Sequence, residues 1–205
     1  MTLSSSGREI GTAIRLTLVL AAITGLAYPL AMTGISQVAF HDQANGSLVS
    51  SNGSVVGSHL IGQQFTGPKY FHGRPSATVS ETDATKAAPY NAQNSAGSNL
   101  APSNPALIDR ISKQVTDLQQ TEPGLKGMAV PVDLVTTDFS GFDPDISEAA
   151  ALVQVERVAW TRNIDVAGVK RLVESHVRGP VLGIFGESHV NVLELNMALD
   201  AGAAH

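Results

Sequence analysis

Cysteine is absent from this chain of 205 residues, and charged residues make up only 15% of it. The missing thiols exclude cysteine catalysis and cysteine-ligated metal. Basic residues are also few: 13 lysines and arginines against 18 acidic residues give a net charge of −5. Because no basic patch stands out, we expect no nucleic-acid partner.

The stretch from Leu16 to Phe40 contains no charged residue, and its first half is almost wholly apolar. As a helix, a run of ~25 residues would be ~37 Å long, enough to cross a hydrocarbon core of roughly 30 Å. The sequence therefore predicts one transmembrane helix over residues 14–36 that carries one soluble domain. Pro29 lies inside the helix and predicts a kink or a ragged exit.

Positive charge precedes this helix and is missing just after it. Arg8 and Arg15 come before the apolar run, and the first charge after it is Asp42. Because positive flanks stay on the cytoplasmic side, we expect a single-pass protein of the cell (inner) membrane. Residues 1–13 would be cytoplasmic, and residues 37–205 would form one extracytoplasmic domain.

A secretory signal is the alternative interpretation of the same stretch. Leu16–Ile23 followed by Gly25-Leu26-Ala27 resembles an apolar region with a small-x-small cleavage site. Apolar residues continue to Ile35, which favours a retained anchor. Both interpretations place the remaining chain outside the cytoplasm.

The first part of the domain predicts a hairpin and then a long loop. Asn52-Gly53 suits the tight turn of a β-hairpin over residues 45–57, and a further strand is plausible at 59–61. Residues 62–105 are rich in Gly, Pro, Ser, Asn and Ala, yet they contain an aromatic cluster. We therefore expect an ordered loop that wraps the domain or contacts a partner.

The second part of the domain mixes helices and short strands. We expect helices that start after Asn104, Ser147 and Asp165, each a good N-cap residue, and a last helix over 190–199. Two further strands are predicted over 130–135 and 181–185. The resulting fold class is an α+β soluble domain with a small sheet, anchored by one N-terminal transmembrane helix.

No catalytic or metal site is expected from the residue patterns. Residues 62–69 have the outline of a phosphate loop, but Pro68 separates its glycine from its lysine, and Tyr70 replaces the required Ser/Thr. The aspartates between 138 and 145 lack EF-hand spacing, and the six histidines are dispersed. No catalytic triad or paired-carboxylate motif emerges.

Two features leave their roles open. Glu156, Arg157 and Arg162 are either surface charges or contacts to a partner or nucleotide. The loop over residues 95–99 consists of small residues, which could let the backbone approach a phosphate or another chain.

Short motifs follow one another along nearly the whole chain. They are Gln64-Phe65, Tyr70-Phe71, Arg74-Pro75-Ser76-Ala77, Ser95-Ala96-Gly97-Ser98-Asn99-Leu100, Val130-Pro131-Val132-Asp133, residues 140–147, Gln154 with Arg157-Val158-Ala159, Gly186-Glu187 and residues 190–196. In order and spacing they resemble the C subunit of the potassium-transporting Kdp ATPase complex of bacteria and archaea. The sequence departs from that family at Ala96, usually a glycine, and at Phe142, usually a leucine.

The resemblance implies a non-catalytic accessory subunit of an ATP-driven, high-affinity potassium uptake complex. Its partners would be a channel-like potassium-binding A subunit, an ATP-hydrolysing B subunit, a small single-span subunit and membrane lipid. In agreement, the chain lacks the Asp-Lys-Thr-Gly-Thr motif of a P-type pump. The family further implies a catalytic chaperone that raises the ATP affinity of the pump subunit. No cofactor would be bound firmly, and ATP would be shared with that subunit.

The resemblance also suggests site residues. The nucleotide-binding set is Gln154, Arg157, Ser95, Gly97, Ser98 and Asn99. The partner-contact set is Phe65, Tyr70, Phe71, Arg74, Asp143, Asn191 and Asn196. An outside domain conflicts with ATP inside the cell, so an extracytoplasmic cap at the potassium entrance, without nucleotide contact, is the alternative. Outside this family, an anchored extracytoplasmic binding module and an exoplasmic hydrolase with a Ser–His pair remain open.

Overall fold

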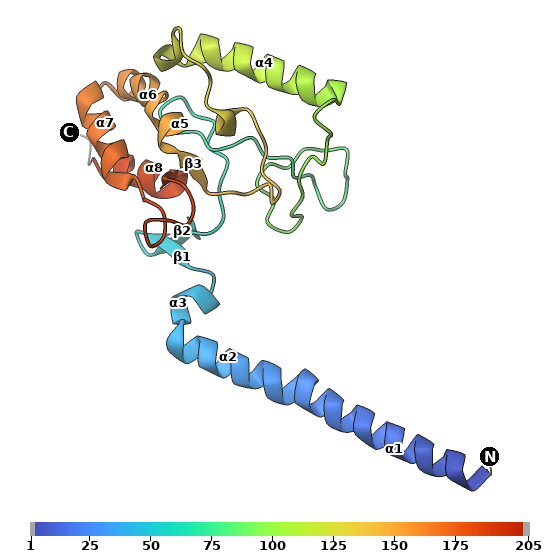
Figure 1. Cartoon of the computed structure of the whole chain (residues 1–205). Helices are drawn as coiled ribbons and strands as arrows, with labels where there is room; N and C mark the ends of the chain where they lie inside the picture. The colour runs from blue at the N-terminus through green and yellow to red at the C-terminus, as the bar shows by residue number, and fades with distance from the viewer. Residues whose placement is uncertain (1–2, 203–205) are drawn as a thin grey trace. The chain divides into compact units, whose positions relative to one another are not determined.

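The structure is a computed structural model that describes residues 3–202 and divides into two units at Ser47 and Leu48 (Figure 1). The first unit is largely helical, and the second is a mixed domain. The expected fold class is confirmed: helices and two small antiparallel sheets follow one N-terminal apolar helix.

The first unit contains a long helix that fits a membrane anchor by length and composition. It consists of α1 (Leu3–Ala22), a π-helical turn η1 (Ile23–Ala27) and α2 (Tyr28–Ala39). The apolar part, Gly7–Ala39, has no buried residue among those described, and it includes the predicted span. The π-helical turn ends two residues before Pro29, whose nitrogen carries no hydrogen for a helical bond, and the helix continues through Pro29 to Ala39 without a ragged exit there.

A short helix, α3 (His41–Ala44), ends the first unit, and a hairpin begins the second. Strands β1 (Leu48–Ser51) and β2 (Ser54–Ser58) pair antiparallel. Asn52 and Gly53 turn the chain with φ of 51° and 78°, as the Asn-Gly pair predicts. The strand expected at 59–61 is reduced to one isolated bridge between Ser58 and Ile61.

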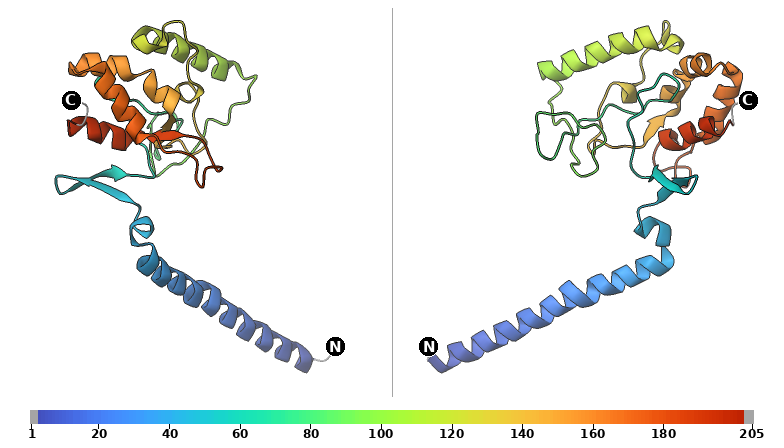
Figure 2. Two further views of the ribbon diagram at one scale, coloured as in Figure 1. Left: turned by 60° about the vertical axis from the view of Figure 1, so that its left-hand side comes forward. Right: turned by 180° about the vertical axis from the view of Figure 1, so that it is seen from behind.

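The segment from residue 59 to residue 104 has no helix or strand longer than an isolated bridge. The two views of Figure 2 show it as an extended trace. It is nevertheless fixed to the domain, because Phe71 is fully buried and its N–H donates to Asn196 Oδ1 over 2.8 Å. The expectation of an ordered, wrapping loop is therefore confirmed.

Helix α4 (Pro105–Thr121) follows, capped by Asn104, whose side chain accepts from Ala106 N. Two 3₁₀ turns come next, η2 (Pro123–Leu125) and η3 (Val132–Leu134). The strand predicted over 130–135 is wrong. The Asp133 carboxylate in this segment instead accepts from Ser147 N over 2.6 Å, and this tertiary contact overrides the local β-propensity.

The remaining elements form the packed half of the domain. Strand β3 (Asp145–Ser147) pairs antiparallel with β4 (His189–Asn191), and neither was predicted. Helices surround them: α5 (Glu148–Leu152), α6 (Val155–Arg162), α7 (Val166–His176) and α8 (Val192–Asp200). The strand predicted over 181–185 is also wrong, since only one bridge, Val181 to Phe185, closes a tight loop there.

The hydrophobic core lies among these four helices. Its fully buried members include Val158 on α6, Val169 and Val173 on α7, and Leu195 on α8. Phe71 joins the same cluster from the extended segment. The core therefore fixes one part of residues 59–104 against α6 and α8, and this contact builds the site described next.

Candidate functional site

Gln154 and Arg157 lie one helical turn apart, at the start of α6, and both point into the domain. Gln154 is 1% exposed and Arg157 is 8% exposed. The interpretation of Arg157 as a surface charge is therefore wrong, because the guanidinium lies inside the fold. We call Glu122, Gln154, Arg157 and the backbone of residues 68–72 the Arg157 cluster.

Each nitrogen of the Arg157 guanidinium has a hydrogen-bond acceptor. Nε donates to Glu122 Oε1 over 2.7 Å, and Nη2 donates to Gln154 Oε1 over 2.8 Å. Nη1 donates to the backbone carbonyls of Pro68 and Tyr70. A buried guanidinium is stable only with such complete pairing, so Arg157 ties α6 to the extended segment.

The side-chain amide of Gln154 is also hydrogen-bonded through both its oxygen and its nitrogen. Its Oε1 also accepts from His72 N over 2.8 Å. Its Nε2 donates to His72 O over 3.1 Å and to Ala150 O over 3.0 Å. The amide therefore pairs with both polar groups of one backbone residue, as a neighbouring β-strand would.

Asn196 on α8 repeats this arrangement one residue earlier. Its Oδ1 accepts from Phe71 N over 2.8 Å, and its Nδ2 donates to Phe71 O over 2.9 Å. Two buried amides, Gln154 and Asn196, thus replace the missing sheet partner of residues 71 and 72. A buried backbone group must find such a partner, so these side chains hold the segment in place.

Burial shifts the protonation of two groups beside Arg157. Burial raises the pKa of Glu122, and the Arg157 charge opposes this shift. Within the described residues, Glu122 Oε2 is buried and has no hydrogen-bond partner. Burial lowers the pKa of His72, and Arg157 lowers it further, against the bond to Gly67 O. The cluster thus favours one buried cation, Arg157, and a neutral His72.

Tyr70 leads from this cluster to the surface. Its ring lies 5.6 Å from the Phe65 ring and 5.0 Å from Arg162 Cζ. Its hydroxyl donates to Asp200 Oδ2 over 3.1 Å, and Arg162 also bonds Asp200. Half-buried aromatic side chains with a polar neighbour suit a protein contact, so Phe65 and Tyr70 stay predicted partner contacts.

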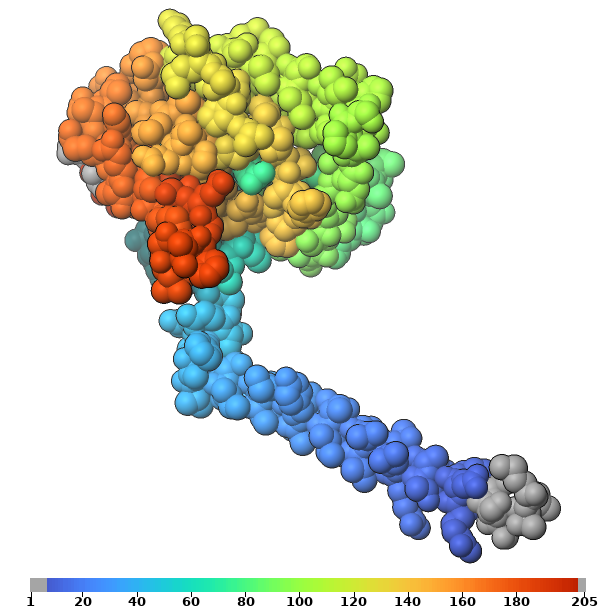
Figure 3. All heavy atoms as spheres, in the orientation of Figure 1, coloured from blue at the N-terminus to red at the C-terminus, as the bar shows by residue number. Residues whose placement is uncertain are grey.

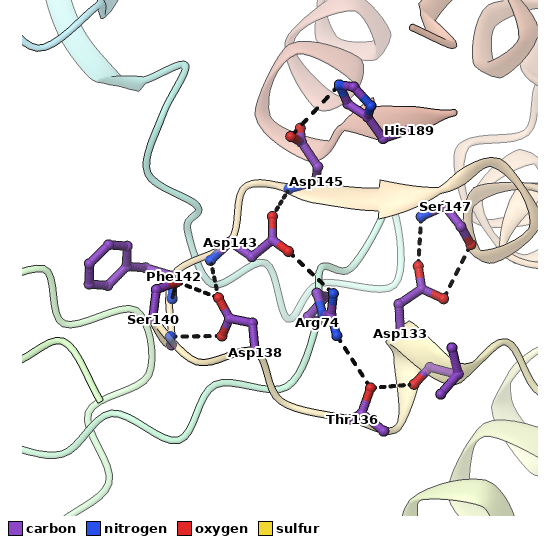
Figure 4. A network of polar contacts seen from close by, with 12 residues as sticks. Arg74, Asp133, Thr136, Asp138, Ser140, Phe142, Asp143, Asp145, Ser147 and His189 are labelled. Atoms are coloured by element: carbon purple, nitrogen blue, oxygen red, sulfur yellow. Dashed lines mark hydrogen bonds and ion pairs between the residues drawn. The ribbon is translucent and has the colours of Figure 1, made fainter. Parts of the chain in front are cut away.

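A second polar network surrounds Arg74, and Figure 4 shows its members. Arg74 Nη1 donates to Asp143 Oδ2 over 3.3 Å, and Nη2 donates to Thr136 Oγ1 over 3.3 Å. Asp138 accepts from the backbone N–H groups of Gly141 and Asp143. Asp138 therefore organises the 138–143 turn.

Asp145 joins this network to β4. Its Oδ1 accepts from Asn191 Nδ2 over 3.1 Å, and Oδ2 lies 4.0 Å from His189 Nε2. Burial raises the pKa of Asp145, and neighbouring Asp143 raises it further, while His189 opposes both. A cavity of about 400 Å³ opens here. It is lined by acidic groups and by Arg74 and His189, so its charge is mixed.

The structure does not gather the whole predicted nucleotide set. Gln154 and Arg157 lie together, but the loop with Ser95, Gly97, Ser98 and Asn99 packs elsewhere, against the 138–142 turn. Ser95 Oγ donates to Ser140 O, and Ala96 N donates to the same carbonyl. Within residues 3–202, no hydrogen bond joins this loop to α6.

The predicted partner contacts divide by burial. Phe71, Asn191 and Asn196 are buried inside the domain, where they hold segments together. The half-buried members are Phe65, Tyr70, Arg74 and Asp143. Sequence reasoning missed Glu122 and Asp133, because each pairs with a residue far along the chain and no local pattern marks such partners.

The geometry of the Arg157 cluster gives it a structural role, which is to hold parts of the domain together. Buried amides and a buried guanidinium cross-link α6, α8 and the 68–72 backbone. Their polar groups are engaged with one another. The arrangement fixes the backbone beside Tyr70, and it engages Gln154 and Arg157, two of the six residues that sequence reasoning assigns to a nucleotide.

Comparison with known proteins identifies the family. The family model "K+-transporting ATPase, c chain" matches residues 10–201. The potassium-transporting ATPase KdpC subunit of Bradyrhizobium diazoefficiens is 58% identical over 201 residues, covering 96% of this chain and 98% of the relative. The KdpC subunit of Paraburkholderia phymatum is 55% identical over 182 residues, covering 89% and 91%.

A third relative gives the same result. The KdpC subunit of Methylobacterium nodulans is 56% identical over 182 residues, which cover 87% of this chain and 89% of the relative. Identity at this level covers 87–96% of this chain in the three relatives. The chain therefore belongs to the KdpC family and is a non-catalytic subunit of the K+-transporting ATPase complex.

Proposed function

We propose that this subunit stabilises the potassium uptake complex by docking and thereby raises the ATP affinity of the pump subunit. The burial of Gln154 and Arg157 carries the proposal, because their polar groups are engaged inside the domain. They support the shape of the surface around Tyr70. The partners would be the channel-like A subunit, the ATP-hydrolysing B subunit and a small single-span subunit.

Docking can change ATP affinity without touching ATP. If the subunit binds more tightly to the pump state that holds ATP, linkage requires that ATP binding tightens equally when the subunit is present. A coupling of about 1–3 kcal/mol corresponds to roughly 5–150-fold in affinity. This route is compatible with a domain on the opposite side of the membrane from ATP.

The same docked domain would cap the potassium entrance of the A subunit. The charged residues before Leu48 are Arg8, Glu9, Arg15 and Asp42, which cancel, so the whole net charge of −5 belongs to the domain. A negative domain raises the local concentration of cations and repels anions. This supports a position near the site where potassium enters.

Direct nucleotide sharing is the competing proposal. It would use Gln154 and Arg157 together with Ser95, Gly97, Ser98 and Asn99. The half-exposed loop favours it, since Asn99 adopts a left-handed conformation with φ of 50° and small residues leave the backbone accessible. It requires that Gln154 leave its bonds to His72.

Accessibility in intact cells tests the side of the membrane. Phe139 is 93% exposed on the domain, and the chain has no native cysteine. We expect that Phe139→Cys in the complex reacts with a membrane-impermeant maleimide added outside. The matched control Glu9→Cys, before the anchor, should react only after permeabilisation. The opposite pattern would put the domain in the cytoplasm and favour nucleotide sharing.

A substitution in the loop separates the two ATP mechanisms. Ser98→Ala removes a predicted nucleotide contact without touching the Arg157 cluster. We expect the assembled complex to keep its ATP affinity with this variant. A tenfold loss of ATP affinity, in a complex that still assembles, would support direct contact and refute coupling through docking alone.

A further inference from the structure

An apolar loop projects from the domain between β4 and the end of α7. Its four large side chains, Val181, Leu182, Ile184 and Phe185, are 63–85% exposed. No charged residue occurs from Gly179 to Gly186; we call these residues the 179–186 loop. Contiguous exposed apolar groups of this kind mark a contact with a membrane or another protein.

Two backbone hydrogen bonds close the loop, and its large side chains are exposed. Val181 N donates to Phe185 O over 2.8 Å, and Phe185 N donates to Val181 O over 3.0 Å. Leu182 has φ of 55°, and Gly183 has φ of 76°. A leucine in the left-handed region is strained, so the fold holds an exposed Leu182 in an unfavourable backbone conformation.

The backbone of the loop is also largely hydrogen-bonded within itself, which lowers the cost of moving it from water into an apolar medium. Four of its backbone N–H groups donate to carbonyls of the loop itself: those of Val181, Gly183, Ile184 and Phe185. In an apolar medium, a backbone donor without a partner is strongly unfavourable. Internal bonding removes that obstacle for most of the tip.

The 179–186 loop lies at the end of the domain where the chain enters. Glu194 bonds both Arg178, at the base of the loop, and His59, just after β2, with 2.5 Å contacts. Both views of Figure 2 place the loop at the same level as β1 and β2, with α4 at the opposite end. Figure 3 shows the loop, in orange-red, as a protrusion from that end.

The β1–β2 region adds exposed apolar residues to this end. Leu48, Val55 and Leu60 are 57–60% exposed. Leu48 is also the first residue of the domain unit, and residues 40–47 separate it from the last residue of α2, Ala39. Eight residues span at most about 28 Å, so the domain is tethered by its apolar end.

We propose that the 179–186 loop inserts into the interfacial layer of the bilayer that holds the N-terminal helix. A shallow insertion of about 5–10 Å matches an apolar tip without a spanning length. A lipid surface fits better than a protein pocket, because the tip contains no Trp, Tyr or Arg and no polar side chain. The domain would then be attached to the membrane at two points, the N-terminal helix and the 179–186 loop. Two attachments fix its orientation relative to the bilayer, whichever side of the membrane the domain occupies.

A lipid-quenching experiment tests this proposal. Because the chain has no cysteine, Ile184→Cys gives a single site for an environment-sensitive fluorophore. The labelled subunit is assembled with cysteine-free partner subunits in nanodiscs that contain lipids brominated in the upper acyl chain. The control is Ile108→Cys on α4, an exposed isoleucine at the opposite end.

We expect a blue-shifted emission at position 184 that is largely lost with brominated lipid, and an unshifted, unquenched emission at position 108. A blue shift at 184 without quenching by lipid would mean that a partner subunit covers the loop. A water-like emission would mean that nothing covers it. Either result overturns the proposal.

A second position guards against a failed variant. Leu182→Cys places the label on the other side of Gly183, and assembly is checked by potassium-stimulated ATP hydrolysis of the complex. Agreement between positions 182 and 184 is required. Quenching at only one of them would contradict insertion of the hydrogen-bonded tip as a unit.

Discussion

Replacing Arg157 by methionine should strongly destabilise the domain. The side chain is 9% exposed, and that of Glu122 is 2% exposed, so solvent cannot compensate for a lost partner. Met fills most of the same volume but donates no hydrogen bond. The change leaves the Glu122 carboxylate buried without its cation. It also removes the Arg157 donor from the backbone carbonyls of Pro68 and Tyr70.

The magnitude follows from the buried pair. Breaking such a pair by removing one partner costs about 3–5 kcal/mol. The lost bonds to backbone carbonyls belong to the same event and are not added. For a chain of this size we expect a decrease in Tm of roughly 10 °C. Since whole domains are stable by only about 5–15 kcal/mol, the variant should be close to unfolding.

Denaturant unfolding of the full-length chain in detergent measures this effect. Arg171→Met is the matched control, because that arginine is 69% exposed and lies 3.9 Å from Asp165; its change should stay within about 0.5 kcal/mol. Glu122→Gln combined with Arg157→Met should recover part of the loss, since no buried charge remains.

Two results would refute this reasoning. A loss of less than about 1 kcal/mol for Arg157→Met would mean that the buried pair does not hold the fold together. A variant with unchanged stability but weaker ATP affinity in the complex would instead place Arg157 at a nucleotide. In that case the direct-sharing mechanism would replace docking.

Three further predictions concern other parts of the domain. Lowering the pH from about 7.5 to about 5.5 should reduce the free energy of unfolding, because the lowered pKa of His72 keeps it neutral in the fold while the unfolded chain takes up a proton near 6.5. In denaturant titrations, the difference in free energy of unfolding between wild type and His72→Gln should shrink over that range; an unchanged difference would exclude His72 as the source of the pH dependence. Asp133→Ala should cost about 1–3 kcal/mol by leaving Ser147 N without its acceptor, seen as a lower denaturation midpoint, whereas Asp133→Asn should cost less. Gly141→Ala should lower Tm by several degrees, since φ is 79° and a Cβ would lie 2.3 Å from Thr78 Cγ2; an unchanged Tm would show that the turn relaxes freely.

Local signals predicted the elements that local chemistry determines. Asn104, Ser147 and Asp165 cap helices as expected, since each side chain accepts from a backbone N–H two or three residues ahead. The hairpin turn at Asn52-Gly53 was also predicted correctly from local sequence. The failures are the strands expected over 59–61, 130–135 and 181–185, since among residues 3–202 these segments form no more β-structure than an isolated bridge.

Strands β3 and β4 show the opposite failure. Each has three residues, and they pair across more than 40 residues of sequence. A three-residue strand has no detectable alternation, and its existence depends on the partner. The interpretation of Arg157 as a surface charge failed for the same reason, because its partner Glu122 is 35 residues away.

The sequence by itself determined the apolar N-terminal helix, the helix starts, the hairpin turn and the family, because these depend on runs, caps and ordered motifs. Only the tertiary structure decided that Gln154, Arg157 and Asn196 are internal, that they replace a sheet partner for residues 71 and 72, and that the 179–186 loop is exposed. Burial is a property of residues distant in sequence that pack together, so no local pattern specifies it.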